Sequence, residues 1–167
     1  MENPNPEVAF VDTHSAFENL TLEDIAAMDT EYETIGSDEI YSLLKDIKDP
    51  EHPELSLAQL RVVKKDQILV QDNLSSALVE YTPTIPTCSV AVLIGLTLLR
   101  KLQLCLPSRF KILLRISAGK HVQEKQVNKQ LADKERVAAA MENPNLFRLV
   151  KTGVHKTDSI PEHLLIW

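Results

Sequence analysis

The chain has 167 residues, of which 44% are hydrophobic and 25% charged, so it is long enough to bury a core and has the composition of a soluble globular protein. Two cysteines argue against a disulfide framework, four glycines against a glycine-rich phosphate loop, and an aromatic content of 5% with scattered basic residues against nucleic-acid binding. The most apolar run, residues 90–99, is about half of what a bilayer span requires, so we expect no membrane segment.

The net charge of −6 is distributed unevenly. Residues 1–36 contain nine acidic side chains, no lysine or arginine, and few large apolar side chains. We therefore predict a solvated, disordered acidic tail over this range. The alternative is that "FENLTLEDIAAMD" forms a short amphipathic helix on a partner. The same range lacks the basic and apolar runs of a secretory signal, which favours a reducing intracellular compartment for the two cysteines.

The next part of the chain predicts one helix, two strands and a second helix. "SDEIYSLLKDIKD" has Ser37 as a candidate N-cap and aliphatic residues spaced for one helix face, and Pro50 ends it. Residues 62–72 and 76–83 predict two strands joined by a short polar connection, which indicates a hairpin. The helix of residues 89–102 is hydrophobic on nearly every side, so we expect it to be buried.

The last part predicts one more strand and two helices. Residues 109–117 alternate apolar and mostly polar side chains, as in a strand with one buried face. Residues 124–143 have helical spacing, and residues 145–153 form a final short helix. The fold class is therefore α+β, a small three-stranded sheet packed with helices in the order α-β-β-α-β-α-α. We assign residues 37–153 to this domain and residues 154–167 to a C-terminal tail.

Cys88 is the first candidate for a reactive group. It lies between a proline-rich turn and the apolar helix, where unpaired backbone N–H groups and the positive end of the helix dipole favour a thiolate. The alternative is a cysteine packed in the core, as free cysteines commonly are. Cys105, near the other end of the same helix, is assigned to packing.

His121 and Glu124 are candidates for completing a metal site. They are three residues apart at a helix entrance, and with Cys88 they would supply nitrogen, oxygen and sulfur ligands suited to zinc or iron. The alternative is that Glu124 stabilises the helix N-terminus and His121 lies at the surface. His52, between two prolines, is interpreted as a turn residue.

Four stretches carry a resemblance to a known family: "IKDPEHPELSLAQLRVV", "YTPTIPTCSVAVLIGL", "KLQLCLP" and "VNKQLADKERVAAAMENPNL". They resemble the eukaryotic cytosolic iron–sulfur protein assembly (CIA) factors of the targeting complex, in a wider family that includes bacterial SufT and PaaD. The resemblance covers about residues 37–150. Some stretches look like the branch with broad clients and others like the branch tied to iron regulatory protein, so the branch stays open.

The resemblance implies an adaptor without enzymatic turnover. Family members join a WD40 β-propeller subunit and a HEAT-repeat subunit and help to deliver 4Fe–4S clusters to client apoproteins in the cytosol and nucleus. Cys88 falls on the family's reactive cysteine, and His121 and Glu124 fall on its Gly-Thr-His-x-x-Glu pattern. No cofactor is obligatory for such an adaptor, although a cluster or metal ion could be held transiently.

Two residues depart from the family pattern. The histidine that usually precedes the reactive cysteine is Thr87, and the threonine before the loop histidine is Lys120, so functions that depend on them are in question. Three hypotheses stay open: an adaptor, a direct metal or cluster carrier and a thiol enzyme. The carrier would use Cys88 with His121 and Glu124, either within one chain or across a homodimer. The thiol enzyme lacks a recognisable general base beside the thiol.

Overall fold

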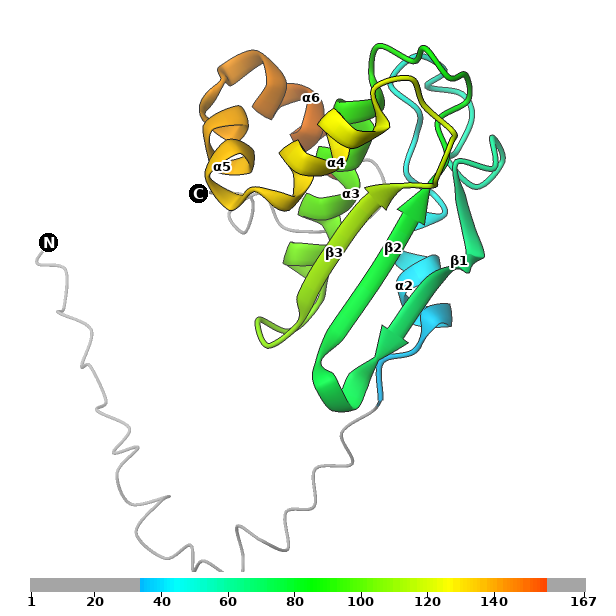
Figure 1. Ribbon diagram of the computed structural model, residues 1–167, viewed down its shortest axis with the longest axis vertical. Helices are drawn as coiled ribbons and strands as arrows, with labels where there is room; N and C mark the ends of the chain where they lie inside the picture. The colour runs from blue at the N-terminus through cyan, green and yellow to red at the C-terminus, as the bar shows by residue number, and fades with distance from the viewer. Residues whose placement is uncertain (1–33, 156–167) are drawn as a thin grey trace, which may run out of the picture. The chain divides into compact units, whose positions relative to one another are not determined.

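The computed structural model describes residues 34–155 (Figure 1). The predicted acidic tail, apart from residues 34–36, and the C-terminal tail beyond residue 155 lie outside the described residues. No helix within the described range is both long and apolar enough to cross a membrane.

A three-stranded mixed sheet forms the centre of the domain. Strands β1 (Val63–Gln71) and β2 (Ser76–Tyr81) are antiparallel neighbours, and the short 3-10 helix η1 (Asp72–Leu74) joins them. Ser75 completes this turn in the left-handed region, with φ 46°. The predicted hairpin is therefore confirmed. Strand β3 (Lys111–Ile116) pairs with β2 in parallel, which gives the sheet order β1-β2-β3.

Helix α3 (Ala91–Cys105) makes the crossover between the two parallel strands. Ten of its fifteen residues are buried, as the all-round apolar pattern predicted. Gly95 permits the close approach of neighbouring elements, since a Cβ there would lie 2.8 Å from the Tyr81 hydroxyl and 2.6 Å from a Leu131 methyl. The crossover helix thus packs without space for a side chain at this point.

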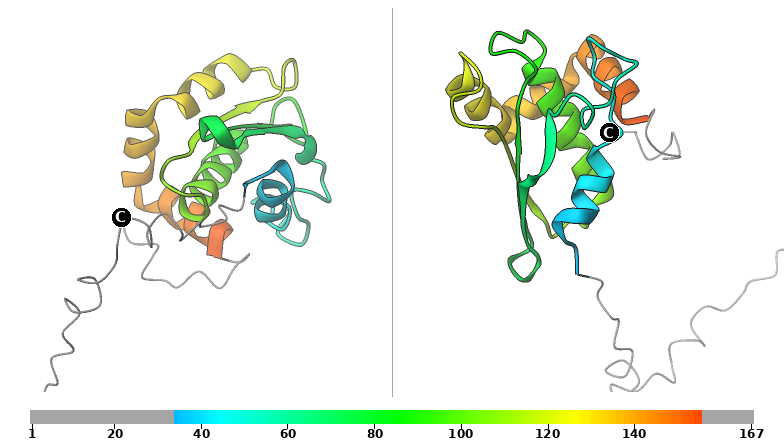
Figure 2. Two further views of the ribbon diagram at one scale, coloured as in Figure 1. Left: turned by 90° about the horizontal axis from the view of Figure 1, so that it is seen from below. Right: turned by 90° about the vertical axis from the view of Figure 1, so that its right-hand side faces the viewer.

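Helix α2 (Ser37–Leu44) packs with α3 on the same face of the sheet (Figure 2). Ile40 and Leu44 are its fully buried residues. Gly36, and not the predicted Ser37, is the N-cap position, and the Glu39 carboxylate accepts a hydrogen bond of 2.8 Å from the Gly36 amide. The helix therefore has its N-cap one residue earlier than predicted, and the Glu39 carboxylate in its first turn stabilises this start.

The prediction of one helix over residues 124–143 is wrong in one respect, because the structure has two helices in this range. Helix α4 (Glu124–Ala132) ends at Asp133, whose side chain accepts hydrogen bonds from the amides of Glu135 and Arg136 at the start of α5 (Lys134–Glu142). An aspartate in this extended conformation caps a new helix in preference to continuing the old one.

The last helix, α6 (Pro144–His155), is capped by Asn143, which accepts hydrogen bonds from the amides of Asn145 and Leu146. It passes through Gly153, where the sequence predicted its end. A Cβ at Gly153 would lie 2.8 Å from a Thr97 side-chain carbon, so α6 and α3 approach closely there. The element order agrees with the predicted α+β arrangement.

No helix of residues 34–155 lies across the opposite face of the sheet (Figures 1 and 2). Leu69 and Leu113 are 63% and 46% exposed on it, whereas Ile68, Val79 and Leu114 face the core. The predicted period-two pattern of the third strand is thus confirmed, with its buried side against the helices.

Candidate functional site around Cys88

Cys88 lies in the turn between β2 and α3. Its amide donates a hydrogen bond of 3.1 Å to the Ile85 carbonyl, and α3 begins only at Ala91. The helix predicted from residue 89 therefore begins two residues later than expected. Because the start of the helix is delayed by the turn, Cys88 lies two residues before the N-cap position, Val90.

The Cys88 side chain is almost fully covered, with a relative exposure of 4%. Its Sγ lies 3.9 Å from Oε2 of Glu51, to which the thiol donates, and the Ser89 hydroxyl donates to Oε1 of the same carboxylate at 3.4 Å. The thiol therefore meets a carboxylate from a loop that lies 37 residues earlier in the chain.

Asp49 holds that earlier loop in position. Its side chain is buried, and its Oδ1 accepts hydrogen bonds from the backbone amides of Glu51, at 2.7 Å, and His52, at 3.1 Å. His52 is exposed in the turn, as predicted, and its Nδ1 lies 3.8 Å from the Glu54 carboxylate. The buried aspartate thus directs the Glu51 backbone toward the thiol.

Burial raises the pKa of the Cys88 thiol above its ordinary value. The backbone N–H of Val90 acts in the opposite direction, while the negative charges of Glu51 and Asp49 raise the pKa further. The thiolate expected from the sequence depended on backbone N–H groups and the helix dipole, whereas burial and the two carboxylates act against it. In this structure the thiol is instead held protonated at neutral pH.

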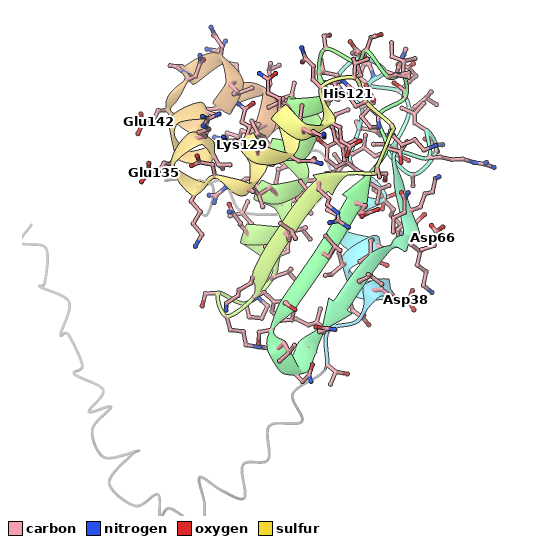
Figure 3. The ribbon with its side chains drawn as sticks, viewed as in Figure 1. Asp38, Asp66, His121, Lys129, Glu135 and Glu142 are labelled. Atoms are coloured by element: carbon pink, nitrogen blue, oxygen red, sulfur yellow. The ribbon has the colours of Figure 1, made fainter. Side chains whose placement is uncertain are left out.

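The His121 ring contacts the backbone of the Cys88 turn. The Gln123 amide donates to Nδ1 of His121 at 3.1 Å, so the ring proton is on Nε2, which donates to the Cys88 carbonyl oxygen at 3.1 Å. Both ring nitrogens are therefore engaged. His121 lies at the end of the domain where the loops that follow β2 and β3 meet (Figure 3).

Glu124 makes a different contact from the one a metal site would need. Its Oε2 accepts a hydrogen bond of 2.6 Å from the Gly119 amide, and Gly119 has a positive φ of 71°. The carboxylate thus closes the loop before α4. Within residues 34–155, no three His, Cys, Asp or Glu side chains form a group that could hold a metal ion.

An open pocket of about 300 Å³ lies over the turn. Cys88 and His121 both line it, together with Thr87, Ser89 and Gln123. The structure therefore brings Cys88 and His121 to one cavity, although they do not converge as ligands. The sequence did not predict a role for Glu51. This residue lies in "IKDPEHPELSLAQLRVV", a stretch that contributed only to the family resemblance.

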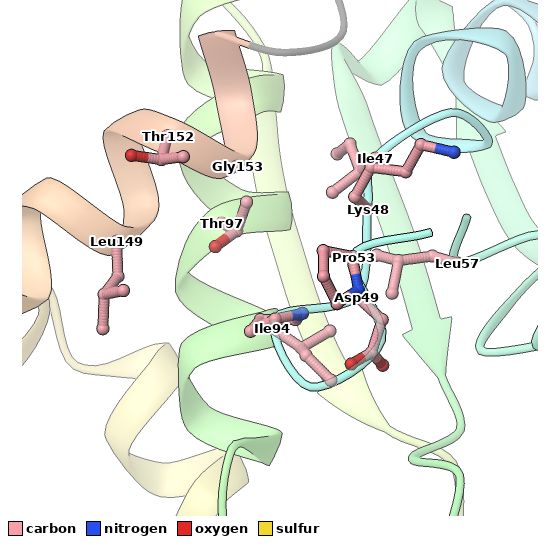
Figure 4. Close-up of a pocket in the computed structure, with 11 residues that line it drawn as sticks. Ile47, Lys48, Asp49, Pro53, Leu57, Ile94, Thr97, Leu149, Thr152 and Gly153 are labelled. Carbon is pink, nitrogen blue, oxygen red and sulfur yellow. The ribbon is translucent and has the colours of Figure 1, made fainter. Parts of the chain in front are cut away.

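A second pocket lies on the other side of the Asp49 loop (Figure 4). It has a volume of about 130 Å³ and is mostly apolar, between the loop, α3 and α6. Asp49 and Pro53 line it from the loop, and Thr97 and Gly153 from the two helices. The loop that carries Glu51 thus lies between the thiol and this apolar pocket.

The chain is similar over most of its length to proteins of plants and insects. A family model described as iron–sulfur cluster assembly protein matches residues 37–111. Protein AE7-like 1 of Arabidopsis thaliana is 46% identical over 138 residues, which cover 81% of this chain and 89% of that protein. MIP18 family protein galla-2 of Drosophila melanogaster is 52% identical over 112 residues, which cover 67% and 71%. This chain belongs to the MIP18 family.

The chain is also similar to a mammalian protein. Cytosolic iron-sulfur assembly component 2B of Mus musculus is 52% identical over 118 residues, which cover 71% of this chain and 72% of that protein. The segment of this MIP18 family chain that the family model matches contains Cys88 and Glu51. It ends at the start of β3, before His121 and Glu124.

Proposed function

We propose that this chain is an adaptor in cytosolic iron–sulfur protein assembly that helps to deliver 4Fe–4S clusters to apoproteins of the cytosol and nucleus. The observation that carries the proposal is the similarity to cytosolic iron-sulfur assembly component 2B of Mus musculus, 52% identity over 118 residues. A family model for iron–sulfur cluster assembly proteins adds support, because it spans the strand–turn–helix segment that holds Cys88.

The partners of this adaptor are a WD40 β-propeller subunit, a HEAT-repeat subunit and the client apoproteins. The open pocket over Cys88 is the surface at which a client or cluster comes near the thiol. It lies at the end of the domain formed by the Cys88 turn and the loop after β3, so the helices and the open sheet face remain for the other subunits.

Cys88 acts in this proposal as a protected thiol. In the isolated chain it is protonated and donates to Glu51, so it reacts slowly with adventitious electrophiles. When a cationic cluster or metal approaches the pocket, its charge stabilises the thiolate and the proton passes to Glu51, 3.9 Å away. The site would then offer one sulfur ligand for the duration of transfer.

The direct-carrier alternative needs more donors than the site offers. His121 uses both ring nitrogens and Glu124 binds the Gly119 amide, so a carrier would have to break these contacts or recruit a second chain. Iron measured in anaerobically purified protein separates the two ideas. About one iron or cluster per chain supports the carrier, and protein without bound iron that still restores client clusters supports the adaptor.

The experiment that tests the thiol is Cys88→Ala in cells that lack the native protein. We expect client cluster content to fall to the level of the empty-vector control, while capture of the propeller subunit is unchanged, because one sulfur contributes little interface. Cys105→Ala is the matched control, since Cys105 lies at the far end of α3.

Two results would contradict this role. Full client cluster content with Cys88→Ala means that the thiol has no part in delivery. Loss of partner capture together with cluster content means that Cys88 is structural. Thiol-dependent turnover of a small substrate by purified protein would favour the enzyme hypothesis over the adaptor.

A further inference from the structure

Strand β3 has one edge without a strand partner. The Lys111 amide donates to the Ser75 carbonyl at 2.7 Å, so the backbone groups of the odd-numbered residues of β3 point toward β2. Those of the even-numbered residues point away from the sheet. At Ile112 and Leu114 these outward groups have no hydrogen-bond partner among residues 34–155.

Asn128 of α4 covers the far end of the same edge. Its Oδ1 accepts a hydrogen bond of 2.7 Å from the Ile116 amide, and its Nδ2 donates to the Ile116 carbonyl at 3.5 Å. The side-chain amide thus takes the place that a neighbouring strand would have at this residue. An added strand can therefore pair with Ile112 and Leu114 and must end before Ile116.

A groove lies beside the uncovered part of the edge. It has a volume of about 760 Å³, and residues of α3, β3 and α5 line it. Leu99, Val137 and Met141 are among its apolar lining residues. The Asp133 cap ends α4 at this point, so α5 does not continue the direction of α4 along the strand. The groove is thus open to a further strand beside β3.

The other outer strand, β1, is a poorer template for strand addition. It has a register shift between Val63 and Ile68, and consecutive charged side chains at residues 64–66. Strand β3 pairs with β2 in unbroken register over all six residues. Figure 1 shows β3 as the outermost strand on the side of α5. The edge of β3 is therefore the one suited to a partner.

The two faces of β3 define what the partner strand must carry. Ile112 and Leu114 lie on the side of the helices, whereas Lys111 and Leu113 are exposed on the open face of the sheet. Side chains of a neighbouring strand alternate between the same two sides. Every second side chain would therefore meet the apolar groove, and those between them would lie on the open face.

The charged residues that line the groove are all basic: Arg109, Lys111 and Lys134. No carboxylate of the described residues lines it. Arg109 already pairs with Asp72 at 3.3 Å, whereas Lys111 and Lys134 make no ion pair within residues 34–155. Opposite charges on neighbouring strands stabilise their pairing. The matching chemistry is an alternation of apolar and acidic residues.

A second copy of this chain fits the edge less well. Two β3 strands that pair antiparallel through all their outward groups must place Ile112 of each copy opposite Leu114 of the other. In that register Lys111 of each copy lies opposite Arg115 of the other on the open face. Like charges directly opposite one another destabilise a strand pair. The edge therefore favours a different, acidic chain.

We propose that the free edge of β3 binds an extended segment of a partner protein as a fourth strand. The segment has apolar side chains at alternate positions, which enter the groove, and acidic side chains between them, which lie near Lys111. Its backbone pairs with the outward groups of Ile112 and Leu114. The groove shares no lining residue with the pocket over Cys88, so this inference does not depend on the role of the thiol.

The test uses the full chain and the synthetic peptide acetyl-EVELEVE-amide, which has this alternation. Amide hydrogen exchange is measured by NMR with the peptide at millimolar concentration. The Ile112 and Leu114 amides should exchange at least about tenfold more slowly, because they gain a strand partner. The Leu113 and Arg115 amides, which face β2, should not change. The peptide acetyl-EEVLVEE-amide has the same composition but apolar residues on both faces, and it should have no effect.

Lys111→Glu should weaken binding of the alternating peptide by about fivefold, since an attraction on the open face becomes a repulsion. Lys125→Glu is the matched control, because it makes the same change of charge at an exposed residue of α4 that does not line the groove. It should leave the affinity unchanged. Equal weakening by the two variants means that only net charge matters, and this overturns the proposal.

Three further results would overturn it. The first is unchanged exchange at Ile112 and Leu114 with the alternating peptide, and the second is an equal effect of the two peptides. The third is slow exchange of these amides without peptide. If that protection rises with protein concentration, a second copy occupies the edge. If it persists on dilution, the chain covers its own edge.

Discussion

The charge of the Cys88 sulfur depends on groups from two different loops. The Val90 amide, which follows Cys88 in its own turn, stabilises a thiolate, while the carboxylates of Glu51 and Asp49 on the earlier loop oppose it. Burial acts with the carboxylates and is the largest influence. At the scale of single residues, therefore, Glu51 is the group through which thiol reactivity can be changed with least disturbance.

Replacing Glu51 by Gln should make Cys88 more reactive. Removal of the negative charge lowers the pKa of the thiol, and each unit raises the thiolate fraction up to about tenfold at pH below the pKa. The measurement is the rate of alkylation by iodoacetamide from pH 6 to pH 10, in a Cys105→Ser background. Glu54→Gln, an exposed carboxylate in the same loop, is the control. Identical rates for Glu51→Gln and the parent would show that the 3.9 Å contact has no electrostatic effect.

The same thiol should make the free energy of unfolding depend on pH. Since the pKa of Cys88 is raised in the folded state above its ordinary value of 9.0, the unfolded chain loses this proton first as the pH rises. The contribution of the protonated thiol to the free energy of unfolding is thus fully present below pH 9 and is lost as the pH rises from there through the raised pKa of the folded state. The stability advantage of the parent over Cys88→Ser should shrink between pH 7 and pH 10 in urea unfolding. A constant difference would contradict the raised pKa.

At the scale of elements, the boundary between α4 and α5 depends on one side chain. The Asp133 carboxylate accepts hydrogen bonds of 3.0 and 3.1 Å from the first free amides of α5. Helix α4 contacts β3, whereas α5 contacts α6. Because one straight helix could not serve both neighbours, the cap at Asp133 sets the direction in which the C-terminal helices pack.

Asp133→Ala should lower the free energy of unfolding by about 1 kcal/mol, the usual effect of removing an N-cap. Asp133→Asn keeps an acceptor at the same position and should cost only a few tenths of that amount. Urea unfolding of the two variants measures the difference. If Ala and Asn are equally stable, the cap is not what separates α4 from α5.

For the molecule as a whole, local patterns predicted the elements but not their long-range neighbours. The alternation of residues 109–117 predicted β3, and the apolar run before it predicted α3. Both predictions succeeded because each pattern depends only on residues close together in the sequence. At residues 124–143 the helical spacing runs on without interruption, but the cap at Asp133 divides the segment into two helices.

The candidate site was less predictable for the same reason. Cys88 and His121 do line one pocket, but Glu51 approaches the thiol across 37 residues of sequence. The sign of the thiol's pKa shift follows from burial and from that distant loop. The residues next to Cys88 in the sequence reveal neither the burial of the thiol nor its contact with Glu51, which lies 37 residues away.

The parallel pairing of β2 with β3 has a consequence for the order of folding. Ser76 lies opposite Lys111, so closure of this ladder closes a loop that contains all of α3, whereas the β1–β2 hairpin closes across the short turn at residues 72–75. Loop closure therefore favours the hairpin early and the third strand late. During synthesis on the ribosome, the inner edge of β2 stays without its partner until β3 has emerged, and an apolar α3 is exposed in the same interval. Between the completion of β2 and the arrival of β3, the growing chain therefore exposes an unpaired strand edge and an apolar segment, two features that favour aggregation.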